Sequence, residues 1–183
     1  MPTLTIYEQQ DFPSVYNWQA IAFMRCEWPS IFQDDILYLS APYPPEFNPV
    51  HFVVAEGESL LSYAAIMKLN IPHAGQNFSV YGFGNMLTFP PYRKQGYGRK
   101  TLQAATEFIQ KSDVDAAILF CDKSLEKYYA TEGWIATQSP TYLCYSGEPV
   151  AYDPLRMMLF VSEKGKTARG DFENSRLYID YPW

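Results

Sequence analysis

The fold is decided by the stretch Arg93-Lys94-Gln95-Gly96-Tyr97-Gly98-Arg99-Lys100. It stands between an expected strand over 77–89 and an expected helix over 98–112. The glycines allow the backbone to turn tightly and to direct successive N–H groups toward one point. The start of the helix adds unpaired N–H donors and its dipole. The stretch therefore predicts a cradle for a phosphate or pyrophosphate; the plainer alternative is a glycine turn with a solvated basic rim.

The periodicity of apolar residues on both sides of this loop predicts mixed α/β structure. We expect helices from Ser14 and over 30–39, 98–112 and 124–133, with the last capped by Ser124. Further strands are expected over 51–56, 60–70, 116–121, 134–137, 141–145, 157–162 and 176–181. In the first helix, the spacing of Trp18, Ile21 and Ala22 predicts a stripe that packs in the core.

A dinucleotide-binding unit is a rival interpretation of the glycine loop. Gly96 and Gly98, followed by a helix, a strand and Asp122, imitate such a unit. The third glycine of that fingerprint is replaced by Thr101, and the loop lies mid-chain behind an expected antiparallel meander. Both features disfavour a nicotinamide-dependent oxidoreductase.

Length, composition and charge exclude several classes of protein. A chain of 183 residues with 48% hydrophobic residues is long and apolar enough to fold as one domain, and its 19% charged residues argue against disorder. The net charge of −6 argues against nucleic acid as a partner and is compatible with a cationic substrate. Aromatic residues make up 17%, which indicates an aromatic-lined cavity or a core built with rings.

The expected setting is the cytoplasm. The three cysteines are widely spaced without a C-x-x-C pair, so neither a disulfide framework nor a metal site is expected. The first residues have no signal-peptide pattern, and no apolar run approaches the ~20 residues of a membrane span.

A second motif, Tyr128-Tyr129-Ala130-Thr131-Glu132-Gly133-Trp134, follows the expected buried strand 116–121. Together, Arg93-x-x-Gly96-x-Gly98 and this segment resemble the two signatures of the GNAT superfamily of N-acetyltransferases over roughly residues 52–135. The resemblance implies a GNAT fold: a mixed, mostly antiparallel sheet with a splayed parallel strand pair and flanking helices. It implies one domain over 1–183, with acceptor-side helices at about 12–40, an acetyl-CoA core at about 51–135 and acceptor-side strands at about 136–183.

The resemblance also implies acetyl-CoA as the acyl donor. Main-chain groups of Met86, Leu87 and Thr88 would pair with its pantetheine arm, and the N–H groups of Gln95 to Arg99 would hold its pyrophosphate. The cofactor-binding residues so implied are Met86, Leu87, Thr88, Arg93, Lys94, Gln95, Gly96, Tyr97, Gly98, Arg99 and Asp122. Asp122 stands where many members carry Asn.

Tyr129 is the candidate general acid, since a phenol can protonate the thiolate that acyl transfer expels. The family register places Tyr129 at the strand gap and Tyr128 in the core, with Trp134 packed behind. The general base is unassigned, because no carboxylate lies between Asn77 and Phe89. A water chain ending on Tyr81 or Glu56 is one option, and an acceptor amine with a naturally lower pKa is the other. His51 and His73 are expected to be structural or exposed.

The C-terminal part is similar to the aminoglycoside 2′-N-acetyltransferases, in Tyr129–Trp134, Pro140-Thr141 and the terminal Asp180-Tyr181-Pro182-Trp183. This similarity implies that the acceptor is a small, cationic amine, acetylated by direct attack in a ternary complex. The candidate acceptor contacts are Trp28, Asp153, Asp180 and Trp183. Two alternatives stay open: a non-catalytic acyl-CoA-binding sensor and an N-acetyltransferase of peptides. A monomer or homodimer is expected.

Overall fold

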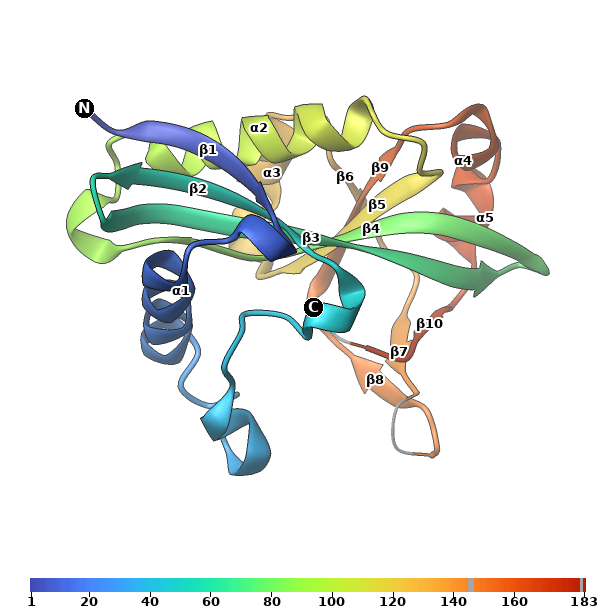
Figure 1. Ribbon diagram of the computed structural model, residues 1–183. Helices are drawn as coiled ribbons and strands as arrows, with labels where there is room; N and C mark the ends of the chain where they lie inside the picture. The colour runs from blue at the N-terminus through green and yellow to red at the C-terminus, as the bar shows by residue number, and fades with distance from the viewer. Residues whose placement is uncertain (145–146, 182) are drawn as a thin grey trace. The chain divides into compact units, whose positions relative to one another are not determined.

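The computed structural model describes residues 1–144, 147–181 and 183. The chain divides into two compact units, Met1–Met67 with Asn85–Ala105, and Lys68–Gly84 with Thr106–Trp183. Three elements, β3 (Ser59–His73), β4 (Gln76–Thr88) and α2 (Tyr97–Gln110), contribute residues to both (Figure 1). The strand order of the main sheet is β1-β2-β3-β4-β5-β9-β6.

The first unit is built on antiparallel strands. β1 (Thr3–Glu8) pairs with β2 (Val50–Glu56), which pairs with the first part of β3. The sequence did not predict β1, because most of its side chains are exposed and leave little apolar signal. The unit also holds α1 (Ser14–Glu27) and the 3-10 segments η1 (Gln9–Asp11), η2 (Asp34–Tyr38), η3 (Pro45–Phe47) and η4 (Pro90–Tyr92).

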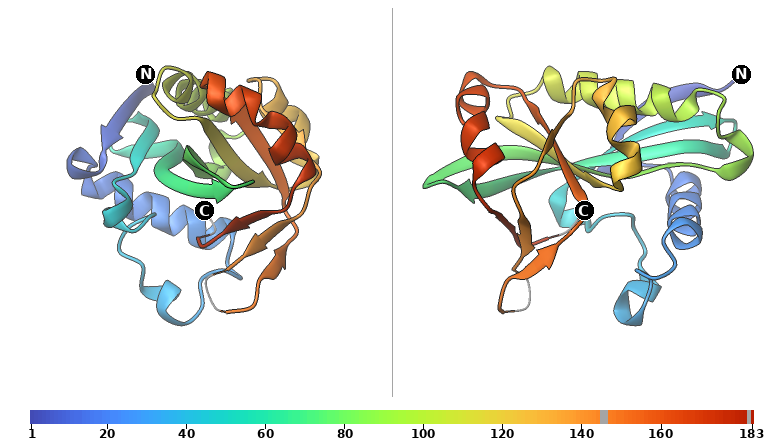
Figure 2. Two further views of the ribbon diagram at one scale, coloured as in Figure 1. Left: turned by 90° about the vertical axis from the view of Figure 1, so that its right-hand side faces the viewer. Right: turned by 180° about the vertical axis from the view of Figure 1, so that it is seen from behind.

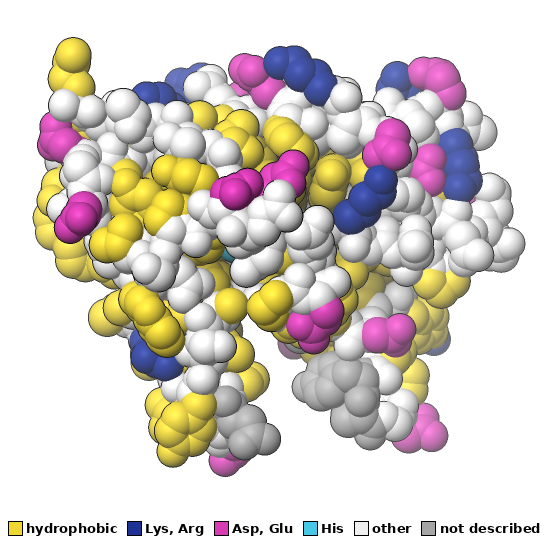
Figure 3. All heavy atoms as spheres, viewed as in Figure 1, with side chains coloured by type: hydrophobic (Ala, Val, Ile, Leu, Met, Phe, Trp, Pro, Cys, Tyr) yellow, Lys and Arg dark blue, Asp and Glu magenta, His cyan; other side chains and the backbone are white. Residues whose placement is uncertain are grey.

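Helix α1 packs with a different face from the one predicted. Its buried residues are Ala20, Ile21 and Met24. Trp18 is 56% exposed and Ala22 is exposed, so the expected core stripe is wrong for these two positions. Hydrophobic side chains also reach the surface over η2, the 3-10 segment that replaces the helix expected over 30–39 (Figure 3).

The second unit combines a parallel and an antiparallel pairing around β5 (Ala116–Cys121). Val80–Phe83 of β4 pair in parallel with Ala116–Leu119, and β9 (Leu155–Phe160) lies antiparallel on the other edge, followed by β6 (Ile135–Thr137). A smaller sheet has the order β10-β7-β8, with bounds Leu177–Ile179, Thr141–Leu143 and Val150–Tyr152. The described pairings of the main sheet are antiparallel except for the parallel pair β4–β5, and this confirms the predicted fold class.

Short helices complete the second unit: η5 (Lys123–Leu125), α3 (Glu126–Ala130), α4 (Glu163–Thr167) and α5 (Arg169–Asn174). Figure 2 shows α4 and α5, in red, beside the strands of the same unit. Phe172 of α5 is fully buried against Phe78 and Phe160. The sequence did not predict α4, α5 or β8, which are too short to show a period. Tyr145, at the end of the strand predicted over 141–145, and Pro182 lie outside the described residues.

Candidate functional site

The glycine loop has the left-handed turns that its sequence indicates. Lys94 and Gly96 have φ angles of 63° and 86°. A Cβ atom built on Gly96 would meet no atom within 4 Å, so the backbone is open to an approaching group at this point. Helix α2 starts at the next residue, Tyr97. Exposed N–H groups at a helix start beside an open backbone turn are suited to a phosphate.

Two side chains of the loop are used to hold its shape. The Arg93 guanidinium donates from Nε to the Thr88 carbonyl at 2.9 Å and from Nη2 to the Glu27 carboxylate at 2.5 Å. The Gln95 amide donates to the Pro91 carbonyl at 3.1 Å. Arg93 thus ties the loop to the end of β4 and to the last residue of α1; its contact with phosphate stays a prediction.

Buried hydroxyl groups tie the first turn of α2 to β3 and β4. Thr101 Oγ1 and Thr88 Oγ1 each donate to Ser62 Oγ at 3.0 Å, and Ser62 Oγ donates to the Leu87 carbonyl at 2.9 Å. Thr101 is fully buried. Its hydroxyl, at the position where a dinucleotide fingerprint needs glycine, is therefore part of the packing of helix against sheet.

The backbone of β4 changes direction after its parallel pairing ends. The last paired residues are Phe83 and Leu119. Asn85 has a φ of 52°, and its side-chain amide donates to the Pro42 carbonyl at 3.1 Å. Met86–Thr88, the predicted pantetheine contacts, follow this irregularity, which a regular strand would lack.

Tyr129, the predicted general acid, is buried in the second unit. It is 6% exposed, and its ring lies edge-on to Phe83 with a centroid distance of 6.2 Å. Burial, with Cys121 and Tyr128 nearby, raises its pKa well above the ordinary value, so the phenol is protonated at neutral pH. Tyr128 is only half-buried, so the predicted division between the two tyrosines is wrong, whereas Trp134 is buried as predicted.

Asp122 holds a local turn. Its carboxylate accepts the Ser124 N–H at 2.8 Å and thereby caps η5, and this hydrogen bond lowers its pKa. The cap is Asp122, and the prediction of Ser124 is wrong because the turn begins two residues earlier. The thiol of Cys121 is buried, which raises its pKa to about 11, so it is a poor nucleophile.

Among the predicted acceptor contacts, Trp183 is placed most tightly. Its indole Nε1 donates to the Ile118 carbonyl at 2.9 Å, and its ring lies 5.4 Å from that of Phe120. The ring of Phe120 also lies edge-on to that of Tyr152, with a centroid distance of 5.0 Å, and Tyr152 directly precedes Asp153 in the sequence. Asp153 and Asp180 are exposed residues of the same unit. Trp28 is half-buried in the first unit, and its backbone N–H donates to the Met24 carbonyl at the end of α1.

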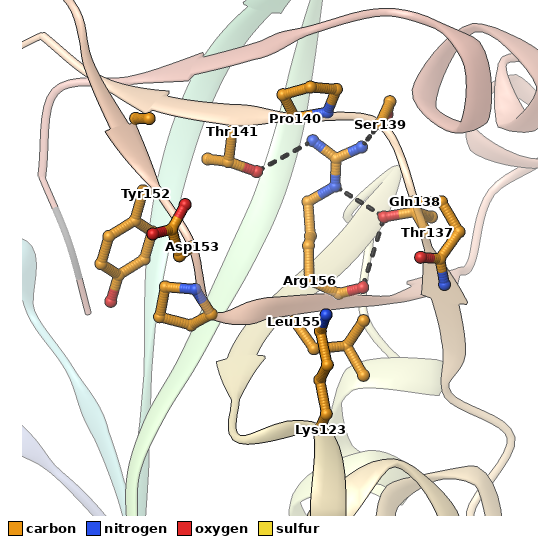
Figure 4. A pocket seen from close by; sticks show the side chains of 12 residues that line it. Lys123, Thr137, Gln138, Ser139, Pro140, Thr141, Tyr152, Asp153, Leu155 and Arg156 are labelled. Carbon is orange, nitrogen blue, oxygen red and sulfur yellow. Dashed lines mark hydrogen bonds between the residues drawn. The ribbon is translucent and has the colours of Figure 1, made fainter.

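Asp153 also lines a cavity of about 230 Å³ that the sequence did not predict. Figure 4 shows this cavity with Arg156 of β9 among its lining residues. The sequence did carry one sign of this site, the single charged residue Arg156 within the apolar run Leu155–Phe160. A charged side chain in a buried strand needs polar or charged partners, which predicts a polar site beside it.

Both histidines are buried in aromatic packing, and their structural role stays a prediction. His51 is fully buried, and its ring stacks on that of Phe12 with a centroid distance of 3.9 Å. Its Nδ1 is hydrogen-bonded to the Tyr63 hydroxyl at 2.8 Å. Burial lowers its pKa to about 4. His73 stacks on Phe172 at 4.2 Å in the second unit.

Within residues 1–144, 147–181 and 183, no cluster of His, Cys, Asp and Glu is suited to a metal ion. In that same part, no helix is long and apolar enough to span a membrane. The open turn at Gly96, followed by α2, fits the pyrophosphate of a coenzyme A.

Comparison with known proteins places these motifs in one family. The model of the acetyltransferase (GNAT) family matches residues 12–152. No curated protein matches the sequence. The fold is similar to that of an acyl-CoA N-acyltransferase from Pseudomonas aeruginosa, with 14% identity, a TM-score of 0.60, and 88% of this chain and 100% of that chain covered.

Two further crystal structures share the fold. Escherichia coli ElaA is 16% identical with a TM-score of 0.56, over 86% of this chain and 99% of that chain. A predicted acetyltransferase with acetyl-CoA from Clostridium acetobutylicum is 16% identical with a TM-score of 0.59, over 75% of this chain and 92% of that chain. Since the family model covers most of the sequence and both expected motifs, the chain belongs to the GNAT family of acetyltransferases.

Proposed function

We propose that this protein transfers an acetyl group from acetyl-CoA to a primary amine of a small, cationic acceptor, by direct attack in a ternary complex. The observation that carries the proposal is the open left-handed turn at Gly96 immediately before α2, inside a chain of the GNAT family. The proposed domain is the whole chain, residues 1–183.

In this proposal the glycine loop binds acetyl-CoA, and Tyr129 donates a proton to the leaving thiolate. The N–H groups of Gln95 to Arg99 receive the pyrophosphate, and backbone groups of Met86–Thr88 receive the pantetheine. Acetyl-CoA supplies the activated acyl group. The reacting amine attacks in its neutral form; as the C–N bond forms and the C–S bond breaks, the Tyr129 hydroxyl gives its proton to the departing sulfur and the phenolate regains one from the acylated nitrogen. The raised pKa of Tyr129 supports the first requirement, a proton present at neutral pH.

The acidic side chains favour a cationic acceptor. The chain carries a net charge of −6, and the exposed carboxylates of Asp153 and Asp180 belong to the unit that contains Tyr129. A local negative potential raises the concentration of a cationic amine at the surface. Neither histidine is the base in this proposal, because both are buried in aromatic packing.

The test is a panel of amines, comprising an aminoglycoside, a polyamine and a short peptide, with release of free thiol from acetyl-CoA as the signal. We expect saturable turnover with at least one small polycationic amine and none with a neutral alcohol. Calorimetry with coenzyme A runs in parallel. Coenzyme A binding without turnover on any amine would support an acyl-CoA sensor instead. Turnover on the peptide alone would show that the acceptor is a peptide and not a small cationic amine.

A further inference from the structure

Arg156 carries a positive charge in the interior of the second unit, and no carboxylate of the described residues forms an ion pair with it. The residue is 2% exposed. Its guanidinium donates to the hydroxyls of Thr137, Ser139 and Thr141, at 2.7, 2.5 and 3.2 Å, and to the Phe172 carbonyl at 2.7 Å. All four acceptors are neutral. A buried charge is costly unless an opposite charge compensates it, so this site is electrostatically incomplete.

The guanidinium also has donor capacity left. It carries five N–H bonds. The four hydrogen bonds above use the one on Nε, one of the two on Nη1 and both on Nη2. One N–H of Nη1 therefore has no acceptor within the described part of the chain.

The cavity of about 230 Å³ lies against this side chain, and a second cation stands at its edge. Lys123 is exposed, and Figure 4 shows its side chain extended toward β9. No carboxylate of the described residues forms an ion pair with Lys123. The single acidic side chain lining the cavity is Asp153, so its lining carries two positive charges and one negative charge.

The guanidinium of Arg156 lies on the face of the sheet opposite to Cys121, the neighbour of Tyr129, although Leu155 of the Cys121 face also lines the cavity. Arg156 pairs with Phe120 across β5 and β9, and the adjacent Leu155 pairs with Cys121. Paired residues project from the same face of a sheet, and consecutive residues from opposite faces. Arg156 therefore projects from the face opposite to Cys121, the residue whose thiol neighbours Tyr129.

We propose that the cavity binds the carboxylate of a small molecule, held by the free Nη1 N–H of Arg156 and the ammonium of Lys123. The charges favour a monoanion, because Asp153 would repel the second charge of a phosphate. The volume, below the ~300 Å³ at which drug-sized pockets begin, fits a small acid. The inference goes beyond the acetyl transfer; Asp153, a proposed acceptor contact, also lines this cavity, but the test below measures anion binding and not turnover.

The test uses the whole protein and two probes, sodium acetate and sodium phosphate, at a constant ionic strength set with sodium chloride. Binding is followed through the side-chain N–H resonances of arginine in ¹H–¹⁵N spectra and through the midpoint of thermal unfolding. We expect a saturable shift of the Arg156 Nε resonance with acetate, a rise of the midpoint, and weaker binding of phosphate.

The variants separate the two cations. Arg156→Gln should weaken acetate binding at least about tenfold, since hydrogen bonds to charged groups contribute about 1.5–3 kcal/mol. Lys123→Gln should weaken it by about two- to fivefold, as for an exposed pair. Arg176→Gln, an exposed change of the same charge, is the matched control and should leave binding unchanged.

Several results would overturn the proposal: no saturable response to either anion, equal binding by the wild type and Lys123→Gln, or tight binding of phosphate without acetate. If Arg156→Gln fails to fold, Lys123→Gln decides alone, because its side chain is at the surface. Asp153→Asn adds a further check: it should narrow the preference for acetate over phosphate, and an unchanged preference would count against the assigned role of the charges.

Discussion

The indole of Trp183 covers the backbone of Gly82. A Cβ atom at Gly82 would lie 2.7 Å from Cδ2 of that ring, closer than packed atoms approach. Trp183 is held there by its hydrogen bond to the Ile118 carbonyl, on the strand that pairs with Gly82. Glycine in this strand is thus explained by the close approach of the C-terminal residue.

Gly82→Ala should expel the indole from this position. Because the added methyl group overlaps the ring, we expect a loss of about 1–3 kcal/mol in the free energy of unfolding. Denaturant unfolding followed by tryptophan fluorescence measures it. In a Trp183→Ala background the same change should cost less than about 0.5 kcal/mol; an equal cost in both backgrounds would show that Trp183 is not the cause.

Tyr129→Phe tests the proton donor. The change removes only the hydroxyl, and Phe retains the packing against Phe83. We expect kcat to fall about 10²- to 10⁴-fold, as for the loss of a general acid. The affinity for acetyl-CoA should stay within about twofold, as measured by calorimetry. Tyr128→Phe is the matched control. An equal fall of kcat in that variant would show that Tyr129 is not the specific proton donor.

Gly96→Asp tests the phosphate cradle against Gly96→Ala. Both replacements meet the same strain at a φ of 86°, because only glycine adopts it freely, but Asp alone brings a negative charge. The two variants should therefore lose similar stability, whereas coenzyme A should bind at least about tenfold more weakly to Gly96→Asp than to Gly96→Ala. Calorimetry that finds equal affinities would place the pyrophosphate elsewhere.

His51 should make stability depend on pH. Its pKa is lowered by burial from an unfolded value near 6.5 to about 4. The unfolded chain therefore binds a proton first as the pH falls, so the stabilisation present above pH 6.5 is lost between 6.5 and 4. The loss amounts to about 3 kcal/mol at most.

Denaturant unfolding at pH 7.5 and pH 4.5 measures this loss. His73 contributes with the same sign, because its pKa is also lowered. The comparison is therefore with His51→Gln, which should show a smaller difference between the two pH values. An unchanged difference would contradict the effect of burial.

Sequence reasoning succeeded where one local pattern carries the structure. The glycine loop, the strand 116–121 and the motif ending at Trp134 were predicted because their turn residues and apolar runs are strong local signals. It failed where distant residues decide. Whether Trp18 or Met24 of α1 is buried depends on what packs against the helix, and a weak apolar period does not reveal that.

The same limit applies to the sites. The predicted roles of Trp28, Asp153, Asp180 and Trp183 rest on likeness of sequence, and the contacts found for Trp183 are a hydrogen bond to Ile118 and packing against Gly82. The cavity at Arg156 was missed because its hydroxyl acceptors come from the end of β6, the connection after it and the start of β7, which no spacing rule joins.

The hydrogen bonds of Arg93 and Gln95 that hold the glycine loop should affect the rate at which a nucleotide binds. The turn is fixed by contacts with Thr88, Glu27 and Pro91 that the protein makes on its own. Much of the entropy lost in ordering the loop is therefore lost during folding. If the loop is the phosphate site that we propose, a nucleotide meets it already in its binding conformation. Association should then be fast and governed by charge and diffusion, with a rate that falls as salt is added, while differences in affinity between related nucleotides should appear as differences in residence time.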